Sequence, residues 1–378
     1  MTITRILTKR LFDGQHFFDD HVLVIADGKI VAIDRDTSNT DSVLPGIVVP
    51  GYIDLQVNGG GGVLFNASPS LDGIKAIMTA HSKYGTTAML PTLITDQIEV
   101  MEKAADAIAE AISQNVPGII GVHFEGPHLS VAKKGAHSEE FIRPISEREW
   151  AVLSRKDLGQ ILVTLAPENV APDDIEKMVS LGIKVCLGHT NATYEIANKA
   201  LQAGADGFTH LFNAMSPLQG REPGVVGAAL LYDNTSCGLI VDGHHVDYTS
   251  CQVALNAKPS GKLFLVTDAM PPVGTDDDKF DFFDRQVFLE DGKLTSTTGE
   301  LAGSALDMAT AVKNTQNHLN VPLDEAIRMA SLYPAQYINK DPLLGTLVKG
   351  AQADFAVLND DLTVAQTWIA GKQVFNQQ

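Results

Sequence analysis

The sequence predicts an α/β protein in which a (β/α)8 barrel is joined to a small β domain built from both ends of the chain. Three observations favour this fold class. Short apolar runs alternate with amphipathic helical stretches through the middle of the chain, β-rich runs separated by turns occupy both ends, and the apolar runs end in polar residues. Strands that alternate with helices form parallel sheets buried on both faces.

The two ends of the chain are similar in character and differ from the middle. Near the start, the segment VLVIADGKIVAI (22–33) places two β-rich runs around Asp27-Gly28, a dipeptide typical of hairpin turns. Near the end, ADFAVLN and TWIAGKQVF repeat this pattern, with a turn expected at Gly371-Lys372. An isolated hairpin is only marginally stable in water, so we expect the two ends to pair with each other.

This pairing predicts the domain organisation. We expect a small β-sandwich domain of residues 1–49 plus 346–378, and a barrel domain of residues 50–345. The alternative is that each end only adds an edge to the central domain. The 378 residues are enough to bury a large core without covalent staples.

Six apolar runs in the middle of the chain are candidate strands of the barrel. Two further runs, GYIDLQV and TTAMLPT, bring the number to eight, so a closed barrel is the economical interpretation and an open doubly wound sheet is the alternative. The six runs are GIIGVHFE (118–125), ILVTLAPE (161–168), IKVCLGH (183–189), GFTHLFN (207–213), CGLIVDG (237–243) and KLFLVTD (262–268).

Two helices between these strands are especially clear. The segment PDDIEKMVSLG begins with Pro172 and two acidic residues and ends at Gly182, as helix termini commonly do. In QIEVMEKAADAIAEAIS the apolar residues recur at intervals of three and four positions. These apolar residues are Ile98, Met101, Ala105, Ile108 and Ile112.

Two segments are expected to be loops. The acidic run TDDDKFDFFD (275–284) is typical of a solvated loop, and it leads into a hairpin around Asp291-Gly292. The run NGGGG (58–62) lacks the lysine and the spacing of a P-loop, so we expect a flexible loop after the first strand rather than a phosphate site.

Composition limits the partners and the compartment. Lys plus Arg number 28 and Asp plus Glu number 46, for a formal charge of −18, which repels nucleic acid and anionic membranes. We therefore expect neither as a partner. Three cysteines without a C-x-x-C pair suit a reducing compartment, and we see neither a signal-peptide pattern nor a membrane-spanning apolar run. These features predict a soluble cytoplasmic protein.

Polar residues end four of the predicted strands. They are Glu125, His189, His210 and Asp268. The carboxyl ends of barrel strands converge on one face, where two imidazoles and a carboxylate with an open position form a common catalytic zinc set. A separate aspartate could take a proton from a metal-activated water. Each residue could instead be a hydrogen-bonded core residue or loop cap, but four separate strand ends favour a metal site.

Ten motifs follow one another in a specific order along the chain. They are QVNGGGGVLFN, HFEGPHL, KKGAHSEEFIR, TLAPE, LGHTNA, THLFNAM, GREPGVVGAAL, DGHHVDY, LVTDAM and LAGSAL. In this order they resemble the N-acetylglucosamine-6-phosphate deacetylases of the amidohydrolase superfamily, and the resemblance covers nearly the whole chain. It implies a metal-dependent barrel with a small β-sandwich made from both termini, in agreement with the fold predicted above.

The resemblance implies a ligand set and an acid/base. It makes Glu125, His189 and His210 metal ligands and Asp268 the catalytic acid/base, with His137 polarising the acetamide carbonyl. Where the superfamily has its first HxH motif, this chain has Gln56-Val57-Asn58, and neutral amides are poor zinc ligands. We therefore expect one divalent metal ion per subunit, zinc before iron, cobalt or manganese.

The resemblance also implies how the substrate is held. The remaining substrate-binding residues are Ala136, Asn213, Ala214, Arg221, His245, Leu301, Ala302 and Gly303. Four of them, Asn213, Ala214, Arg221 and His245, are expected to hold the sugar phosphate. Arg221 is expected to reach the site of the neighbouring subunit, which implies a homodimer. Without the resemblance, Arg221 would be interpreted as half of a surface salt bridge with Glu222, and His245 as a loop hydrogen-bond partner.

The expected reaction is hydrolysis of the acetamide of N-acetyl-D-glucosamine 6-phosphate to D-glucosamine 6-phosphate and acetate, in amino-sugar catabolism and recycling. Two other interpretations stay open. Another amidohydrolase, such as a dihydroorotase or an N-acyl-amino-acid hydrolase, could use the same barrel, because fold alone does not separate these activities. A non-catalytic barrel that serves as scaffold or sensor is the second, although such proteins typically lose the ligands that are present here.

Overall fold

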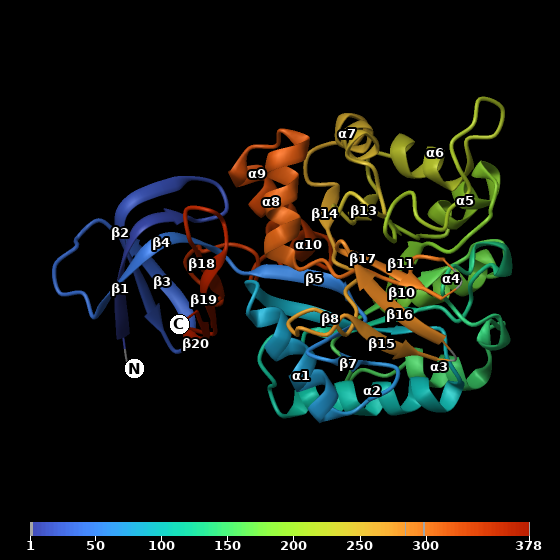
Figure 1. Ribbon diagram of the computed structural model, residues 1–378, viewed down its shortest axis with the longest axis horizontal. Coiled ribbons are helices and arrows are strands. Elements are labelled where there is room, and N and C mark those ends of the chain that lie inside the picture. Colours follow the sequence, from blue (N-terminus) through green and yellow to red (C-terminus); the bar gives the residue numbers. More distant parts are fainter. Residues whose placement is uncertain (1–2, 284, 298, 378) are drawn as a thin grey trace.

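Eight parallel strands form the centre of the computed structural model, which describes residues 3–283, 285–297 and 299–377 (Figure 1). Neighbouring strands follow one another along the chain, and the last returns to the first: Val57 forms a parallel bridge with Ala269. This closure confirms the predicted barrel and excludes the alternative of an open doubly wound sheet. Its strands are β5 (Tyr52–Val57), β8 (Thr86–Ile94), β9 (Gly121–Glu125), β10 (Gln160–Leu165), β11 (Lys184–Leu187), β12 (Gly207–Phe208), β13 (Ser236–Leu239) and β14 (Leu263–Leu265).

Helices surround the barrel and explain its continuous apolar strands. Every residue of β5 and β8 is buried, because the barrel interior covers one face and helices cover the other. Both helices singled out in the sequence form. The helices are α1 (Leu71–Ser82), α2 (Ile98–Ser113), α3 (Glu147–Leu153), α4 (Pro172–Ser180), α5 (Tyr194–Gln202), α6 (Gly224–Leu231), α7 (Tyr248–Ala257), α8 (Met308–Leu319), α9 (Leu323–Ala330) and α10 (Leu332–Tyr337), with 3-10 turns at Val131–Lys133 and Glu139–Phe141.

The two ends of the chain share a second, seven-stranded sheet beside the barrel (Figure 1). In this sheet β4 pairs with β1 on one side and with β18 on the other, and the sheet has its own apolar core. The pairing of both ends agrees with the predicted fold, while the limits 1–49, 346–378 and 50–345 stay a prediction. Its strands are β1 (Ile3–Phe12), β2 (Phe17–Ala26), β3 (Lys29–Asp34), β4 (Ser42–Pro50), β18 (Phe355–Leu358), β19 (Val364–Ile369) and β20 (Lys372–Asn376).

The hairpin turns of this sheet follow the turn chemistry of the sequence. Asp27 and Gly28 join β2 to β3 with φ angles of 50° and 75°, as a type I′ turn requires. At the other end, Ala370 and Gly371 have φ angles of 49° and 72°, so this turn lies one residue before the position predicted at Gly371-Lys372.

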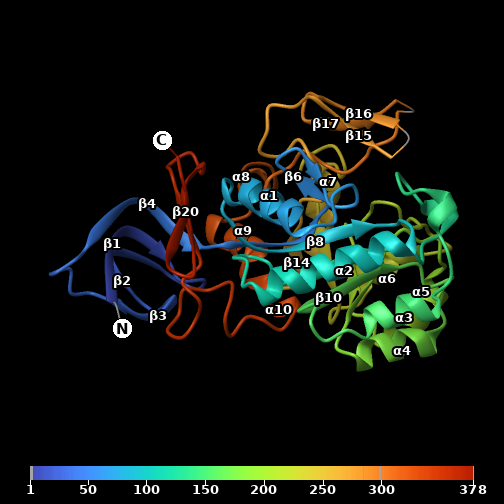
Figure 2. The same ribbon diagram turned by 90° about the horizontal axis from the view of Figure 1, so that it is seen from below.

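A three-stranded sheet covers the mouth of the barrel (Figure 2). It consists of β15 (Lys279–Phe282), β16 (Arg285–Glu290) and β17 (Lys293–Ser296), and its second hairpin turns at Asp291-Gly292 as predicted. The prediction of a solvated loop over 275–284 is wrong for β15, because Phe282 is fully buried against Met270 and Leu294. Asp284, at the end of that predicted loop, lies outside the described residues.

The glycine run after the first barrel strand is also more regular than expected. Instead of a flexible loop, β6 (Gly59–Gly60) pairs with β7 (Val63–Leu64) in a very short hairpin. A side chain at Gly59 would come within 2.5 Å of the carbonyl oxygen of Val63, so glycine is needed for this close approach. Among the described helices, none is both long and apolar enough to cross a membrane.

The buried carboxyl of Asp354, just before β18, allows a test of how burial of a charge affects the smaller sheet. Its side chain is 5% exposed, one carboxylate oxygen accepts a hydrogen bond from the Ala370 amide, and burial raises the pKa to about 7. Because the folded pKa exceeds the unfolded value, this carboxyl contributes most to stability below about pH 4 and loses that contribution as pH rises to 7. The Asp354→Asn variant should therefore gain several degrees in Tm relative to the wild type between pH 5 and pH 8.

The matched control is Asp361→Asn in the same sheet, where hydrogen bonds from Thr363 lower the pKa of an exposed carboxyl. This control should gain no Tm on the wild type over the same pH range. A Tm difference for Asp354→Asn that does not change with pH would mean that the carboxyl is ionised at no cost in the folded protein.

Candidate metal centre and active-site cavity

A cavity of about 430 Å³ opens at the carboxyl ends of the barrel strands. Most of the site residues predicted from the sequence line it, although they come from distant parts of the chain. They are Glu125, Ala136, His137, His189, His210, Asn213, Ala214, His245, Asp268, Leu301 and Gly303.

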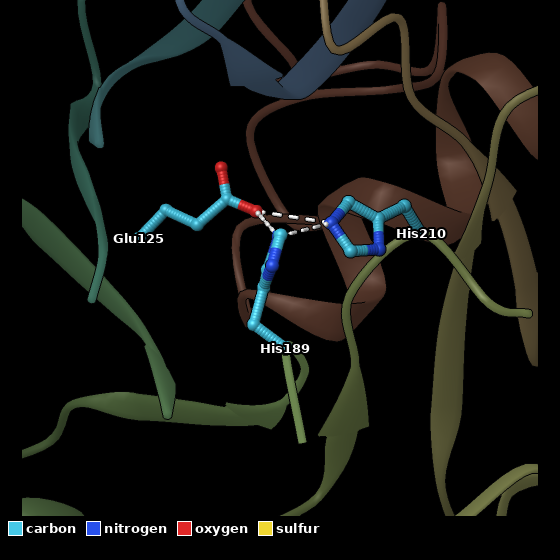
Figure 3. A group of neighbouring side chains, drawn as sticks. All are labelled: Glu125, His189 and His210. Atoms are coloured by element: carbon cyan, nitrogen blue, oxygen red, sulfur yellow. Dashed lines mark hydrogen bonds and ion pairs between the residues drawn. The ribbon is translucent and has the colours of Figure 1, made fainter. Parts of the chain in front are cut away.

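Three of these side chains converge on one point (Figure 3). Oε1 of Glu125 lies 3.2 Å from Nε2 of His189 and 3.1 Å from Nε2 of His210, and the two Nε2 atoms are 3.0 Å apart. All three side chains are buried. The three atoms are of the kinds that bind divalent metal ions, so the residues could hold one.

The orientation of His189 favours a metal over a hydrogen-bonded cluster. Its Nδ1–H donates a hydrogen bond to the carbonyl oxygen of Lys133 at 2.9 Å, and this tautomer leaves a lone pair on Nε2. That lone pair faces two other potential acceptors. Ligand atoms about 2.0–2.1 Å from a tetrahedral zinc ion lie about 3.3 Å from one another, close to the separations seen here.

The electrostatics of the cluster agree with a cation site. Burial raises the pKa of Glu125, but the two histidines, when their rings are protonated, outweigh burial through hydrogen bonds and charge and hold that pKa well below its usual value. Burial lowers the pKa of His210, while the hydrogen bond and charge of Glu125 reverse the effect and raise it. The pocket thus keeps an ionised carboxylate in a buried position, which requires a positive partner.

The backbone at three strand ends has an unusual conformation. His189, His210 and Asp268 have φ angles of 47°, 34° and 55°, in the left-handed region that L residues rarely adopt. Such strain persists only where the surrounding structure imposes it, and it clusters at functional sites. Here it accompanies three polar side chains that follow β11, β12 and β14 and line one cavity.

Asp268 faces the cluster from the end of β14. Burial and the charge of Glu125 raise its pKa to about 6. Its Oδ1 accepts hydrogen bonds from Nε2 of Gln56 at 3.2 Å and from Nδ2 of Asn58 at 2.6 Å. Its Oδ2 has no hydrogen-bond partner within the described part of the chain, so this oxygen is available to a molecule in the cavity.

His137 is held as a neutral hydrogen-bond donor. Its Nδ1 accepts from the backbone amide of Thr95 at 3.3 Å and lies 2.9 Å from the Thr95 hydroxyl, so the proton of the neutral ring is on Nε2. Burial and the nearby charge of His189 keep the pKa of His137 well below its usual value. The ring can therefore donate from Nε2 to a carbonyl oxygen in the cavity.

The opposite part of the cavity has donors suited to an anion. Nδ1 of His245 lies 2.6 Å from Oδ2 of Asp242. Burial raises the pKa of Asp242, but interactions led by the hydrogen bond from His245 outweigh burial, and the net result is a pKa below the usual value. The Asp242 carboxylate accepts this hydrogen bond and fixes the orientation of the His245 ring. Beside it, Ala214 has a φ angle of 49°, and its backbone amide makes no hydrogen bond within the described chain.

Two predicted residues do not line the cavity of their own chain. Ala302 is fully buried between Leu301 and Gly303, within the apolar core under the three-stranded sheet. Arg221 is exposed on the loop before α6, away from the cavity lining. The salt bridge with Glu222 does not form among the described residues, because the Glu222 carboxylate accepts hydrogen bonds from the amides of Tyr194 and Gly224.

Sequence reasoning missed several residues of the cavity. Lys133 lines it and orients His189 through its carbonyl oxygen, and Glu300 places a carboxylate at the rim. Phe282 forms an apolar wall from β15, for which the alternation of Phe280 and Phe282 was an available signal. Asn58 was interpreted as the start of a loop and as an amide in place of a metal-binding histidine, although its Nδ2 donates a hydrogen bond to Asp268.

The sequence of the chain is similar to those of known enzymes. The chain matches the Amidohydrolase family over residues 47–374. It is 53% identical over 333 residues to an N-acetylgalactosamine-6-phosphate deacetylase of Shewanella, covering 88% of this chain and 84% of the relative. It is 38% identical over 325 residues to an N-acetylglucosamine-6-phosphate deacetylase of Haemophilus influenzae, covering 85% of each.

Solved structures of similar proteins have the same fold. The N-acetylglucosamine-6-phosphate deacetylase of Pasteurella multocida superposes with a TM-score of 0.95 at 39% identity, over 98% of this chain and 99% of that chain. A mutant of the enzyme from Mycobacterium smegmatis, in complex with N-acetyl-D-glucosamine-6-phosphate, superposes with a TM-score of 0.93 at 30% identity, over the full length of both chains.

The cluster of Glu125, His189 and His210 makes a direct prediction about metal content. His189→Ala removes one of three ligand atoms, so the metal bound per chain after dialysis should fall well below the wild-type value, measured by inductively coupled plasma mass spectrometry. Wild-type protein should hold one ion per chain, because Gln56 and Asn58 offer only neutral amides where further ligands would stand.

The control is His137→Asn, which changes a buried histidine of the same cavity that is not part of the cluster. This variant should keep the wild-type metal content. Unchanged metal in His189→Ala would remove His189 from the ligand set, and two tightly bound ions in the wild type would contradict the single site.

Proposed function

The chain belongs to the amidohydrolase family. We propose that it hydrolyses the acetamide of N-acetyl-D-glucosamine 6-phosphate to D-glucosamine 6-phosphate and acetate. The observation that carries the proposal is the cluster of Glu125, His189 and His210 facing Asp268 in one cavity. The named relatives and structural neighbours support the substrate class. Such a reaction belongs to the catabolism and recycling of amino sugars.

A second candidate substrate is the C4 epimer, N-acetyl-D-galactosamine 6-phosphate. The 53% identical relative from Shewanella carries that name, whereas the relatives from Haemophilus influenzae and Pasteurella multocida, which are named for the glucosamine compound, are 38% and 39% identical. The two sugars share the acetamide and the phosphate and differ in one hydroxyl group. Both fit the chemistry of the residues described above, so the same reaction is proposed for either sugar.

The metal would be held by Glu125, His189 and His210, and the mixed carboxylate and imidazole set suits zinc best, with iron, cobalt and manganese as alternatives. When bound, a divalent ion would supply Lewis acidity and lower the pKa of the water that it binds toward neutrality. Every other step of the reaction falls to side chains of this chain.

Asp268 and His137 would divide the work on the amide. His137 donates a hydrogen bond from Nε2 to the amide oxygen, where negative charge develops as the tetrahedral intermediate forms. Asp268 accepts the proton of the attacking water at Oδ2, the oxygen without a partner in the described chain. It then passes that proton to the nitrogen, so that the C–N bond breaks with an amine rather than an amide anion as leaving group.

The phosphate end of the substrate would bind far from the reacting bond. His245, held by Asp242, and the backbone amide of Ala214, which has no hydrogen-bond partner in the described part of the chain, would donate to phosphate oxygens, with Asn213 beside them. We propose that Arg221 completes this site from a neighbouring subunit, since its exposed position does not reach the cavity of its own chain. A planar guanidinium suits phosphate oxygens, and this arrangement requires a homodimer.

A cytoplasmic location is supported by the cysteines. Cys186, Cys237 and Cys251 are all free and buried. Chains that function in oxidising compartments commonly pair their cysteines, whereas buried free thiols are usual in reducing ones.

The reaction itself can be tested by acetate release. Metal-loaded wild-type protein should release acetate from N-acetyl-D-glucosamine 6-phosphate, its C4 epimer, or both, and the ratio of kcat/KM values identifies the preferred sugar. Asp268→Asn should keep its metal and lose about 10²- to 10⁴-fold in kcat, because the base is gone. Near-normal turnover by Asp268→Asn would rule out its acid/base role, and no acetate from either sugar would rule out the proposed function.

Arg221 allows a test of phosphate recognition across subunits. Arg221→Ala should raise KM for the phosphorylated sugar about tenfold or more, with little change for the unphosphorylated N-acetylhexosamine. Mixing inactive Asp268→Asn subunits with Arg221→Ala subunits should restore wild-type KM in hybrid dimers, because Asp268→Asn subunits supply the arginine. Equal effects of Arg221→Ala on both sugars would show that this arginine does not bind phosphate.

A further inference from the structure

We propose that Gln56 and Asn58 are positioning residues for Asp268, which hold Oδ1 of its carboxylate so that Oδ2 alone faces the reacting groups. The inference rests on the proposed hydrolysis, in which Asp268 accepts and returns a proton. Neither amide touches the reacting atoms in this scheme. Both act through the aspartate.

The hydrogen bonds of Asp268 are concentrated on one oxygen. Asn58 donates from Nδ2 at 2.6 Å and Gln56 from Nε2 at 3.2 Å, and both bonds end on Oδ1. Within the described chain, Oδ2 accepts none. An oxygen that already accepts two N–H donors is a poor proton acceptor, so the incoming proton is directed to Oδ2.

The orientation of Asn58 shows that its bond to Asp268 has priority. Its Nδ2 faces the carboxylate, while its own Oδ1 is buried without any hydrogen-bond partner in the described structure. A buried acceptor without a partner is costly, and a flipped amide would place Oδ1 against a carboxylate oxygen. The Asn58 amide therefore keeps Nδ2 toward Asp268, although its Oδ1 is then left without a hydrogen bond in the described structure.

Gln56 links the proposed base to the metal cluster. Its Nε2 carries two hydrogens and lies 3.2 Å from Oδ1 of Asp268 and 3.2 Å from Oε1 of Glu125. A neutral amide can thus bridge two carboxylates that would repel each other, without adding charge to the site. This bridge sets the separation between the base and the cluster that would hold the metal.

The backbone supports the same arrangement. The Asp268 amide donates to the Gln56 carbonyl at 2.9 Å, and the Asn58 amide donates to the Ala269 carbonyl at 3.0 Å. These contacts with the end of β5 and the residue after it hold Asp268 in its left-handed conformation. Main chain and side chains of Gln56 in β5 and of Asn58, just after β5, therefore fix both the backbone and the carboxylate of the same aspartate.

The test uses Asn58→Leu, which removes the donor at similar volume, in metal-loaded full-length protein. The kcat for acetate release should fall about 10- to 100-fold, with KM and metal per chain unchanged. In an Asp268→Asn background, adding Asn58→Leu should cause no further loss, because the amide acts only through the aspartate. Gln56→Met should behave in the same way with a smaller loss.

The matched control is Asn66→Leu. Asn66 is also a buried amide that donates to a carboxylate, but its partners are Asp96 and the Ile94 carbonyl. Per folded, metal-loaded chain, Asn66→Leu should keep the wild-type kcat. A fall in kcat for Asn66→Leu equal to that of Asn58→Leu would reduce the effect to general loss of packing and overturn the inference.

Two further results would also overturn it. Metal loss in Asn58→Leu in proportion to the fall in kcat would show that the residue acts through the cluster, and multiplied losses in the double variant would show that it does not act through Asp268. Crystal structures of the wild type and Asn58→Leu test whether Asn58 holds the Asp268 carboxylate without measuring turnover. We expect the Asp268 carboxylate to turn in the variant; an unmoved carboxylate contradicts the inference even if the substrate assignment fails.

Discussion

The active-site cavity depends on the hydrogen bonds that join the first strand of the barrel to the end of the last. The Asp268 amide donates to the Gln56 carbonyl, and Val57 forms a parallel bridge with Ala269. With this contact the eight strands form a ring, and all their carboxyl ends face one side. Residues that are far apart in the chain meet there, which is why the site needs no short motif.

The strand-end residues of the site could be predicted from sequence, because parallel strands that alternate with helices must end on the same face. The same residues also explain why one predicted strand is longer than the observed one. The run 207–213 was expected to be a strand through His210, yet β12 ends at Phe208, because His210 has a left-handed backbone that ends regular pairing. The conformation that makes the residue functional is the one that periodicity alone does not reveal.

The groups that orient these side chains could not be predicted. A backbone carbonyl orients His189, and since every residue has one, Lys133 carries no signal for this role. Phe282 lines the cavity from β15, which lies within the acidic run 275–284, and the negative charge of this run favoured a solvated loop. The overall charge of −18 was equally uninformative about the site, because affinity for an anion depends on a few donors inside one cavity.

The sheet shared by the two ends has a consequence for how the protein is made. Phe355 on β18 pairs with Pro50 on β4, so nearly the whole chain separates two neighbouring strands. During synthesis the N-terminal strands leave the ribosome long before their partners exist, and β4 keeps an open hydrogen-bonding edge through translation of the entire barrel. The nascent chain must therefore protect that edge until β18 emerges, and the smaller sheet closes only after the barrel has been synthesised.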